Sequence, residues 1–428
     1  MATTSRRKSD TSVPRQRSRS KHSAEPRSTQ PKTAEPKNAE RKDADRRRRP
    51  RTRRRKVPLW ASLAVTFGAL VMLAVGGALV ALRSVVGTLE DSIQVVDVLD
   101  DAAKQPTESG KALEGAIDLL LLGIDTRSTQ ERDDARADTV LVVHIPATHD
   151  QAYLMSIPRD TRVTIPDAPN GMKSISDKIN GAFTRGAMKG GGWAGGLALT
   201  ARTVKNLTGI EFDGAAVIDF GGFKKVIETL GSVNLCVEAD TRSSHYFVLK
   251  PGGKPTYVNG SGNDGLPVEK RLGINGKQYL HKKGCRDMQA WEALDFARIR
   301  KGAADNQGDY SRQRHQQQLI KAMMKKATTS GALTDIGKLN ALLKAVGQSM
   351  LLSLKGITLV DFLFTMKDLA GSDLVLLKTN SGRYNSYKVN GQSFERLDDL
   401  TLEMFKAAKN DTLGQFTARY PEFVNNEK

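Results

Sequence analysis

Residues 57–82 contain 26 consecutive uncharged residues, directly after the basic segment 53–56. As a helix this run would be about 39 Å long, enough to cross a hydrocarbon core of roughly 30 Å. A buried core helix rarely extends so far without a polar residue, and a cleavable signal peptide would not follow 56 residues of chain. Because Lys and Arg mark the cytoplasmic end of a span, we expect a single-pass cell-membrane anchor with a cytoplasmic N-terminus and an extracytoplasmic C-terminal domain.

The formal net charge of +19 is concentrated before this run. Residues 1–56 carry 21 Lys and Arg against 6 Asp and Glu, whereas the rest of the chain carries 45 against 41. Residues 1–56 have too few apolar side chains to offset the entropy of ordering, so we expect a disordered tail that attracts anionic headgroups. Binding of nucleic acid or another partner is the alternative for this tail. The remainder is nearly neutral and has no helix-turn-helix pattern, so a DNA-binding regulator is the weakest function class and we expect no nucleic-acid partner.

Two cysteines, Cys236 and Cys285, follow the predicted anchor. In an oxidising exterior they favour a disulfide, which would close a loop of about 50 residues and contribute about 3 to 4 kcal/mol in the chain-entropy model. Two unpaired core thiols are the alternative. The chain has no Cys-x-x-Cys motif, and its histidines show no zinc spacing.

Beyond the anchor, residues 83–116 read as a stalk, and residues 117–408 alternate apolar runs with helical patterns. This alternation predicts an α/β fold, an αβα layered domain with a mixed central β-sheet, in which residues 146–150 form a hairpin turn. A long polar excursion at 240–284 and a C-terminal tail at 409–428 complete the chain. The predicted strands are 117–124, 139–145, 151–157, 215–219, 233–237 and 374–378, and the predicted helices are 197–207, 222–230, 288–300 and 310–327.

Charged residues gather in five short segments, each at or just past the end of a predicted strand or helix. In α/β sheets such ends converge on a cleft. One arginine there would suit a structural ion pair, but several arginines that outnumber the nearby carboxylates require an anion, and guanidinium groups bind phosphate bidentately. The polar residues concerned are Asp125, Arg136, Asp138, Arg159, Asp160, Arg298, Arg300, Asp309, Arg312, Arg314 and Gln316.

Two of these carboxylates, Asp125 and Asp138, would repel each other in an empty cleft. With Mg²⁺ or Mn²⁺ between them and a diphosphate, they become ordinary ligands of a hard cation. Arginines with an aspartate-held metal are the recurring parts of phosphoryl-transfer sites. No Walker loop or Rossmann glycine fingerprint is present.

Seven ordered blocks resemble the LytR-CpsA-Psr proteins of Gram-positive bacteria, and the cysteine pair and basic tail are most similar to the actinobacterial branch. The resemblance covers residues 117–325, and more loosely extends to 408. The blocks are Leu-Leu-Leu-Gly-Ile-Asp-Thr-Arg (120–127), Arg-Ala-Asp-Thr (136–139), Ser-Ile-Pro-Arg-Asp (156–160), Lys-Ile-Asn-Gly-Ala-Phe (178–183), Asp-Phe-Gly-Gly-Phe (219–223), Ala-Leu-Asp-Phe-Ala-Arg-Ile-Arg (293–300) and Gly-Asp-Tyr-Ser-Arg-Gln-Arg-His-Gln-Gln (308–317).

This resemblance implies an extracytoplasmic phosphotransferase for cell wall biogenesis. A peptidoglycan hydroxyl would attack the phosphorus nearer the sugar of a polyprenyl-diphosphate-linked glycan and expel polyprenyl phosphate. The family match assigns the metal to Asp125 and Asp138, diphosphate binding to Arg136, Arg159, Arg298 and Arg300, and the shaping of the site to Asp309, Arg312 and Gln316.

The last block departs from the family pattern, which often has Arg immediately before the final Gln. This chain has His315 there and an additional Arg314, a candidate for substrate binding. Asp160 is a candidate general base, and its alternative role is to orient Arg159.

Two other function classes share this site. A polyprenyl-diphosphate hydrolase would use water as the nucleophile, and a non-catalytic scaffold or regulator would bind the lipid without turnover. The glycan itself can be arabinogalactan, teichoic acid or another polymer.

Overall fold

The computed structural model describes residues 94–104, 115–125, 135–258, 276–300, 307–332, 335–354 and 373–425. The predicted basic tail, the predicted anchor and most of the predicted stalk lie outside these residues. In the described part of the chain, no helix has both the length and the apolar character that a membrane span requires. The anchor at 57–82 therefore stays a prediction.

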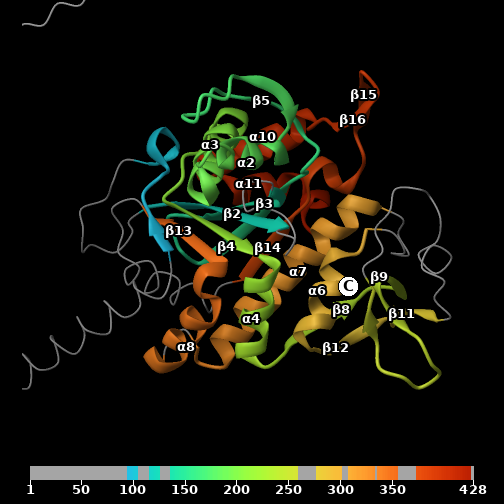
Figure 1. Cartoon of the computed structure of the whole chain (residues 1–428). Helices are drawn as coiled ribbons and strands as arrows, with labels where there is room; N and C mark the ends of the chain where they lie inside the picture. Colours follow the sequence, from blue (N-terminus) through green and yellow to red (C-terminus); the bar gives the residue numbers. More distant parts are fainter. Residues whose placement is uncertain are drawn as a thin grey trace, which may run out of the picture. The chain divides into compact units, whose positions relative to one another are not determined.

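A seven-stranded sheet forms the centre of the described domain (Figure 1). From one edge to the other its strands are β1 (Gln94–Val96), β13 (Met350–Leu354), β7 (Gly214–Asp219), β2 (Ile117–Asp125), β3 (Arg136–Ile145), β4 (Gln151–Ile157) and β14 (Asp373–Leu377). The pairs β1–β13, β7–β2 and β4–β14 are parallel, and the other three pairs are antiparallel. The predicted mixed sheet is confirmed.

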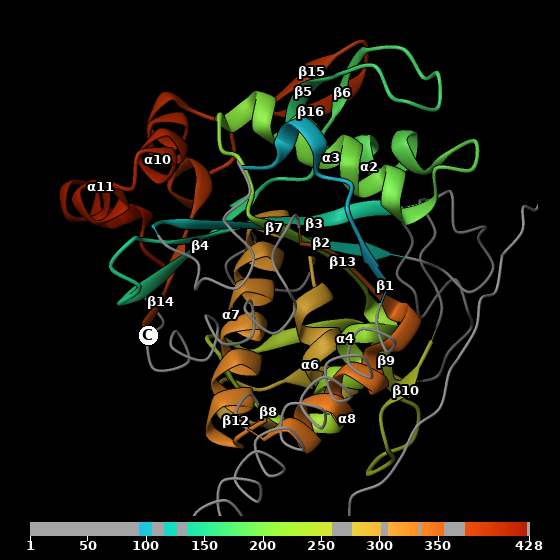
Figure 2. The same cartoon turned by 90° about the vertical axis from the view of Figure 1, so that its left-hand side faces the viewer.

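Helices lie on both faces of this sheet, as the edge-on view in Figure 2 shows. The prediction of an αβα layered domain is therefore confirmed. One face carries α2 (Asn180–Ala187), α3 (Gly192–Thr208), α10 (Asp399–Lys409) and α11 (Leu413–Arg419). The other carries α4 (Phe220–Leu230), α6 (Ala290–Arg298), α7 (Gly308–Thr329) and α8 (Ile336–Val346).

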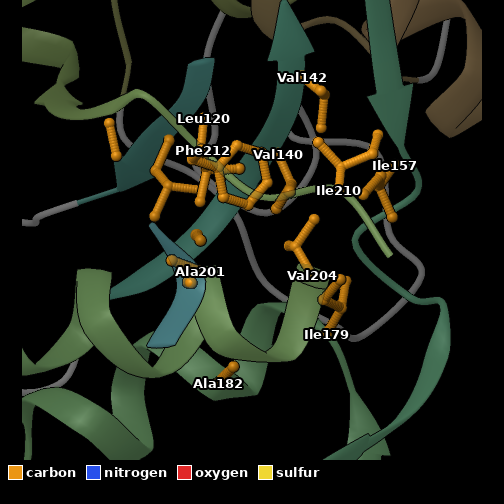
Figure 3. Close-up of a cluster of buried hydrophobic side chains, with 14 of the residues drawn as sticks. Leu120, Val140, Val142, Ile157, Ile179, Ala182, Ala201, Val204, Ile210 and Phe212 are labelled. Atoms are coloured by element: carbon orange, nitrogen blue, oxygen red, sulfur yellow. The ribbon is translucent and has the colours of Figure 1, made fainter. Parts of the chain in front are cut away.

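The central strands are apolar on both faces because both faces are covered. In β2, Leu120 and Leu122 pack into the core beneath α2 and α3, whereas Leu119 belongs to the core on the opposite face. Figure 3 shows Leu120 among the sheet residues that meet Val204 of α3. Burial on both sides produces the continuous apolar run that predicts this strand.

Most predicted elements of the first half of the domain are confirmed. Strands β2, β3 and β4 form where expected, and residues 146–150 connect the antiparallel pair β3–β4. The predictions for β7, for β8 (Val233–Val237) and for helices α3, α4 and α7 are also confirmed. The predicted helix at 288–300 begins later, as α6, because Met288 ends the strand β12 (Gly284–Met288).

Several short elements were not predicted from the sequence, most of them because they are polar or half exposed. Within the predicted excursion, β9 (Thr241–Val248), β10 (Thr256–Tyr257) and β11 (Lys277–His281) form an antiparallel sheet. Elsewhere the sequence analysis missed the hairpins β5 (Arg162–Ile165) with β6 (Ile175–Lys178) and β15 (Ser386–Val389) with β16 (Gln392–Glu395), together with β1, β13, α2 and α11.

The predicted domain end at 408, with a tail at 409–428, is wrong. Helix α11 follows α10, and Phe416 and Phe423 join the core beneath α3. The backbone N–H of Asn425 donates to the carbonyl oxygen of Leu376 at 2.8 Å. The domain extends to residue 425 because these aromatic side chains are buried against the sheet.

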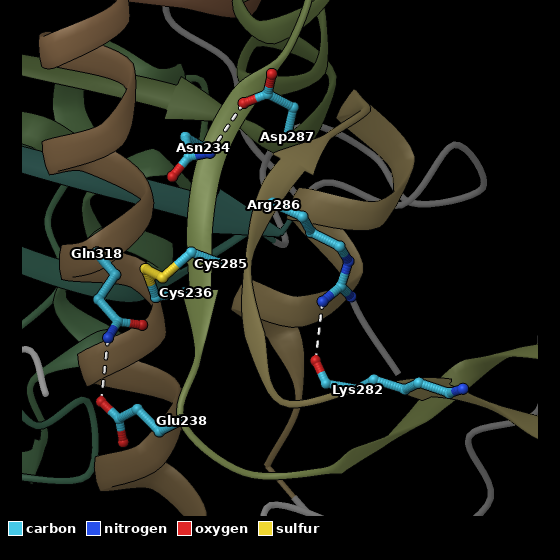
Figure 4. The surroundings of a disulfide bond; sticks show 8 residues. All are labelled: Asn234, Cys236, Glu238, Lys282, Cys285, Arg286, Asp287 and Gln318. Atoms are coloured by element: carbon cyan, nitrogen blue, oxygen red, sulfur yellow. Dashed lines mark hydrogen bonds between the residues drawn. A yellow bond between two sulfur atoms is a disulfide. The ribbon is translucent and has the colours of Figure 1, made fainter.

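Cys236 and Cys285 form the predicted disulfide (Figure 4). They are directly opposite each other in the antiparallel pair β8–β12, with their Cα atoms 3.9 Å apart and a sequence separation of 49. The bond joins the two ends of the segment that contains β9 and β11. The disulfide therefore ties this segment at its base.

Candidate active site

A cavity of about 530 Å³ lies where β2 ends and α7 begins. All the residues predicted for the site line it except Arg136, Asp160 and Arg314. The lining residues are Asp125, Asp138, Arg159, Phe220, Ser244, His245, Arg298, Arg300, Gly308, Asp309, Arg312, Gln316 and Tyr384. The cavity therefore joins residues from the sheet, from three helices and from β9.

A β-bulge places Asp138 in this cavity. In the β2–β3 pair, Gly123 is opposite Thr139 and Ile124 is opposite Ala137, so Asp138 is the extra residue of β3. Such a bulge locally interrupts the ladder and redirects a side chain. Gly123 is required beside it, because a Cβ at this position would lie 2.9 Å from the Cβ of Thr139.

Arg159, which follows β4, pairs with Asp138. Its Nη1 donates to Asp138 Oδ1 at 2.7 Å, and Arg312 Nη1 lies 4.0 Å from the other carboxylate oxygen. Burial alone would raise the pKa of Asp138, but Arg159 and Arg312 outweigh it and hold this pKa below its ordinary value. Asp138 is therefore a carboxylate at neutral pH.

Helix α7 presents Asp309, Arg312 and Gln316 on one face because these residues are three and four positions apart. The adjacent Gln317 is buried, and its Nε2 donates to Ser156 Oγ at 2.8 Å and to the carbonyl oxygen of Leu377 at 2.9 Å. These bonds attach the polar helix to β4 and β14. The rotation of α7 is thereby fixed with Gln316 toward the cavity.

Asp309 is the meeting point of three arginines. Its Oδ1 lies 2.7 Å from Arg312 Nη2, 3.3 Å from Arg300 Nε and 3.7 Å from Arg159 Nε. The hydroxyl of Tyr384 accepts from the backbone N–H of Asp309 at 2.9 Å. Asp309 holds the guanidinium groups side by side, which mutual repulsion would otherwise oppose.

Arg298, at the end of α6, is positioned differently. Its guanidinium carbon lies 4.5 Å from the ring centroid of Phe220, and its Nη2 is 3.9 Å from Asp125 Oδ2. Stacking on an aromatic face leaves the edge of the guanidinium available for hydrogen bonds. Phe220 therefore supports one face of the Arg298 guanidinium, while its N–H donors stay available to a ligand.

The cavity has a surplus of positive charge, since four arginines and three aspartates line it. Arg159 Nε and Arg312 Nε are buried and donate to no acceptor within the described ranges. Burial lowers the pKa of Arg312, and the neighbouring Arg159 acts in the same direction, against Asp309. An anion with several oxygens would satisfy these donors and relieve the repulsion.

Arg136 and Arg314, two of the predicted site residues, do not line this cavity. Arg136 begins β3 and lines a separate cavity of about 290 Å³ with Lys178 and Arg185. Arg314 points away, because it is two residues from both Arg312 and Gln316 and so lies on another side of α7. Its Nε is 3.1 Å from Glu238 Oε2. The structure therefore does not place Arg136 or Arg314 at this cavity, and their roles in substrate binding stay predictions.

The structure also locates Asp160, the candidate general base, and His315. Asp160 does not line the cavity, and its Oδ1 is 2.8 Å from Lys178 Nζ. Its other oxygen lies 3.9 Å from Arg159 Nε, which favours the orienting role over that of general base. His315 is buried and stacks on Phe296 at a centroid distance of 4.0 Å, so it does not replace a phosphate-binding arginine.

Sequence reasoning missed five lining residues: Phe220, Ser244, His245, Gly308 and Tyr384. Phe220 and Gly308 belong to the blocks at 219–223 and 308–317, so the family resemblance signals them. Ser244 and His245 lie on β9, in the segment predicted as an excursion, and Tyr384 precedes β15. No local pattern marks these three residues, because distant parts of the chain bring them to the cavity.

Asp125 and Asp138, the predicted metal ligands, line the same cavity. Arg159 occupies one oxygen of Asp138, whereas the arginine nearest to Asp125 is 3.9 Å away. Within the described ranges, no group of three or more His, Cys, Asp or Glu side chains is arranged to hold a metal ion.

The Asp138 pair predicts a dependence of stability on pH. Because the pKa of Asp138 is lower in the folded chain than its ordinary value of 3.8, the unfolded chain binds more protons and the pair's stabilisation is lost as the pH falls below that value. We expect Tm to fall more on acidification for the wild type than for Asp138→Asn, measured by circular dichroism. Asp97→Asn, an exposed control, should retain the wild-type slope. Equal slopes for all three proteins would contradict the prediction.

Residues 86–411 match the model of the LytR_cpsA_psr family. The chain belongs to this family. The resemblance found in its seven sequence blocks is therefore confirmed. The match covers the whole cavity, from Asp125 to Tyr384.

Two relatives illustrate the similarity to other members of the LytR_cpsA_psr family. The polyisoprenyl-teichoic acid–peptidoglycan teichoic acid transferase TagV of Bacillus subtilis is 28% identical over 221 residues, which are 52% of this chain and 46% of that protein. The chain thus matches less than half the length of TagV. The enzyme of the same description named TagU, from Halalkalibacterium halodurans, is 24% identical over 290 residues, 68% of this chain and 78% of that protein.

The fold is similar to a solved structure of the protein gbs0355 from Streptococcus agalactiae. The TM-score is 0.52 at 20% sequence identity, and the match covers 70% of this chain and 88% of that chain. At this identity the likeness shows the fold alone.

Proposed function

We propose that the chain is a phosphotransferase that moves a glycan phosphate from a polyprenyl-diphosphate carrier to a hydroxyl group of peptidoglycan. The observation that carries this proposal is the cavity in which four arginines meet three aspartates. Two buried guanidinium nitrogens there donate to no acceptor in the described part of the chain. A diphosphate provides several acceptor oxygens and the charge that this arrangement lacks.

The relatives support the donor and acceptor classes. TagV and TagU are both described as transferases of polyisoprenyl-linked teichoic acid to peptidoglycan. Both are less than 30% identical to this chain, so the proposal takes from them the lipid carrier and the peptidoglycan acceptor and leaves the polymer unspecified.

The mechanism uses positioning and charge neutralisation. Arg159, just past β4, and Arg312 of α7 bind the diphosphate oxygens, together with Arg298 and Arg300 at the end of α6. The acceptor oxygen forms a bond to the phosphorus nearer the sugar. The bond from this phosphorus to the bridging oxygen breaks, and polyprenyl phosphate leaves. Because the guanidinium groups are already held by Asp138 and Asp309, they stabilise the charge that develops without moving.

The two carboxylates fit Mg²⁺ or Mn²⁺ when the substrate supplies further ligands. Mg²⁺ is commonly held by one or two carboxylates together with substrate phosphates and water. Arg298 Nη2 lies 3.9 Å from Asp125 Oδ2, too far for a hydrogen bond, so Arg298 leaves both oxygens of Asp125 open to a cation. Arg159 binds Oδ1 of Asp138 and leaves Oδ2 open. When bound, the ion would add positive charge beside the diphosphate.

The predicted anchor suits this reaction. We place the domain outside the cytoplasm on a single span at residues 57–82, with the N-terminus inside. The polyprenyl chain of the donor can then stay in the bilayer while its diphosphate enters the cavity.

The test uses the full-length protein in detergent with a polyprenyl-diphosphate glycan and peptidoglycan fragments, and measures glycan coupled to the acceptor. We expect EDTA to lower coupling about a hundredfold or more, since a bound cation contributes several kcal/mol to such transition states. Added Mg²⁺ or Mn²⁺ should restore it in the wild type and in the exposed control Asp399→Ala, but not in Asp125→Ala.

Other outcomes would assign the cavity to another function. Release of polyprenyl phosphate without coupling would indicate the hydrolase. Tight donor binding with no product in any metal would indicate the scaffold. Full coupling in EDTA would contradict the metal assignment, whereas the proposed transferase activity would stand.

A further inference from the structure

A buried group of polar residues lies behind the cavity wall that β9 forms. His245 lines the cavity, and its Nδ1 is 3.2 Å from Asp295 Oδ1. The other carboxylate oxygen of Asp295 is 2.7 Å from His281 Nε2. The side chains of Asp295 and His281 are 0% exposed, whereas that of His245 is 22% exposed.

Ser243 completes the arrangement and fixes the backbone of His245. Its hydroxyl oxygen accepts from the backbone N–H of His245 at 3.0 Å and from that of Tyr246 at 2.8 Å, and the hydroxyl also hydrogen-bonds to Asp295. Burial alone would raise the pKa of Asp295, but the hydrogen bonds from His245, His281 and Ser243 hold it below its ordinary value. Asp295 is therefore an ionised acceptor that orients His245.

This contact selects the tautomer of His245. An ionised carboxylate only accepts hydrogen bonds, so Nδ1 of His245 carries the proton and Nε2 carries a lone pair. No described residue forms a hydrogen bond to Nε2. An aspartate that holds an imidazole by Nδ1–H, with Nε2 open to the substrate, is the arrangement that prepares a histidine as a base.

We propose that His245 is the general base of the transfer, a role that rests on the proposed function. As the acceptor oxygen bonds to phosphorus, its proton passes to His245 Nε2. The phosphorus–oxygen bond to the leaving group breaks, and polyprenyl phosphate departs as an anion. Asp295 stabilises the imidazolium that forms, and the proton then passes to water.

The other polar residues of the cavity are committed elsewhere. Arg159 and Arg312 hold the pKa of Asp138 below its ordinary value, which weakens it as a base. Asp309 is engaged by Arg312, Arg300 and Arg159. Asp160 does not line the cavity. Among the described lining residues, His245 is the one whose ring nitrogen combines a lone pair with a carboxylate behind it.

Charged and titratable groups of several elements lie around His245. Each of them can contribute to the pH dependence of the coupling rate. Helix α6 contributes Asp295 and Arg298, and β11 contributes His281. Tyr257 of β10 stacks on the His245 ring at a centroid distance of 6.3 Å. The cavity side contributes Asp125, Arg300, Asp309 and Arg312.

The experiment measures glycan coupling by the full-length protein across pH, together with donor binding. His245→Asn keeps a donor for Asp295 but has no base, and we expect kcat to fall about a hundredfold or more at neutral pH with donor affinity unchanged. The part of the wild-type pH dependence that comes from this base should disappear. In His245→Ala, added imidazole should restore part of the rate. Asp295→Asn, a positioning variant, should lower kcat and shift the pH profile without weakening donor binding.

Tyr257→Phe removes a titratable hydroxyl beside the same ring and should retain the wild-type profile. Coupling by His245→Asn at the wild-type rate would overturn the proposal, as would a lower rate that keeps the wild-type pH dependence. Either of these two results would leave the proposed function intact. Absence of coupling in the wild type itself would overturn the proposed function, and the base assignment with it.

Discussion

Replacing Arg159 by alanine is expected to lower kcat/KM for glycan coupling about a thousandfold, the effect of removing one preorganised donor from a site of developing charge. Arg159 contacts both Asp138 and Asp309, and its buried Nε donates to no acceptor in the described ranges. The substitution removes a phosphate ligand and leaves Asp138 with Arg312 at 4.0 Å as its nearest described cation. Steady-state coupling assays with the lipid-linked donor measure the loss.

Two further variants separate this role from folding. Arg159→Lys keeps the charge but loses the planar fork, so coupling should stay well below that of the wild type. Arg162→Ala is the matched control three residues along the chain, where the guanidinium is exposed and its Nε donates to Ser176 Oγ at 3.0 Å. It should couple normally. An Arg159→Ala protein that keeps both its melting curve and its activity would contradict the assignment of Arg159 to phosphate binding.

Reduction of the disulfide is expected to lower the free energy of unfolding by about 4 kcal/mol, from the loop-closure entropy of a cross-link across about 50 residues. Cys285 is exposed, so a soluble thiol reaches the bond. The reason for the loss lies in the unfolded chain, where β8 and β12 are otherwise free to separate. Urea titrations with and without dithiothreitol, followed by circular dichroism, measure the difference.

The double variant Cys236→Ser with Cys285→Ser provides the control for thiol chemistry. It should unfold at the urea concentration of the reduced wild type and should not respond to dithiothreitol. Identical unfolding curves for the oxidised and reduced wild type would contradict the expected contribution of loop closure.

The sequence predicts the strands of this fold well where apolar residues recur along the chain, and poorly where they do not. Strand β2 and its neighbours β3 and β4 are apolar on both faces, and this produces an unambiguous local pattern. Strand β9 is short of apolar residues and half exposed, so its sequence is typical of a loop. The sequence of residues 409–428 predicts a tail because Phe416 and Phe423 carry no periodic signal, although both are buried.

In the candidate site, too, some features follow from the sequence and others only from the structure. Motif order places Asp125, Asp138, Arg159 and the residues of α7 in one cleft, and the structure confirms that they line one cavity. Helical geometry excludes Arg314, since positions 312, 314 and 316 cannot share a face, and this exclusion was available from the sequence. The bulge that redirects Asp138 was not, because it depends on the register between β2 and β3.

The sequence by itself determined the mixed α/β architecture, the disulfide partners and the surplus of arginines over carboxylates in the motif segments, because these depend on composition and on neighbours along the chain. Only the tertiary structure decided which arginines converge, that Asp309 joins them, and that β9 brings His245 to the cavity with Asp295 behind it. Contacts such as Arg159 with Asp309 and His245 with Asp295 join residues that are far apart in the sequence, and packing against the sheet, which no local pattern records, sets their distances.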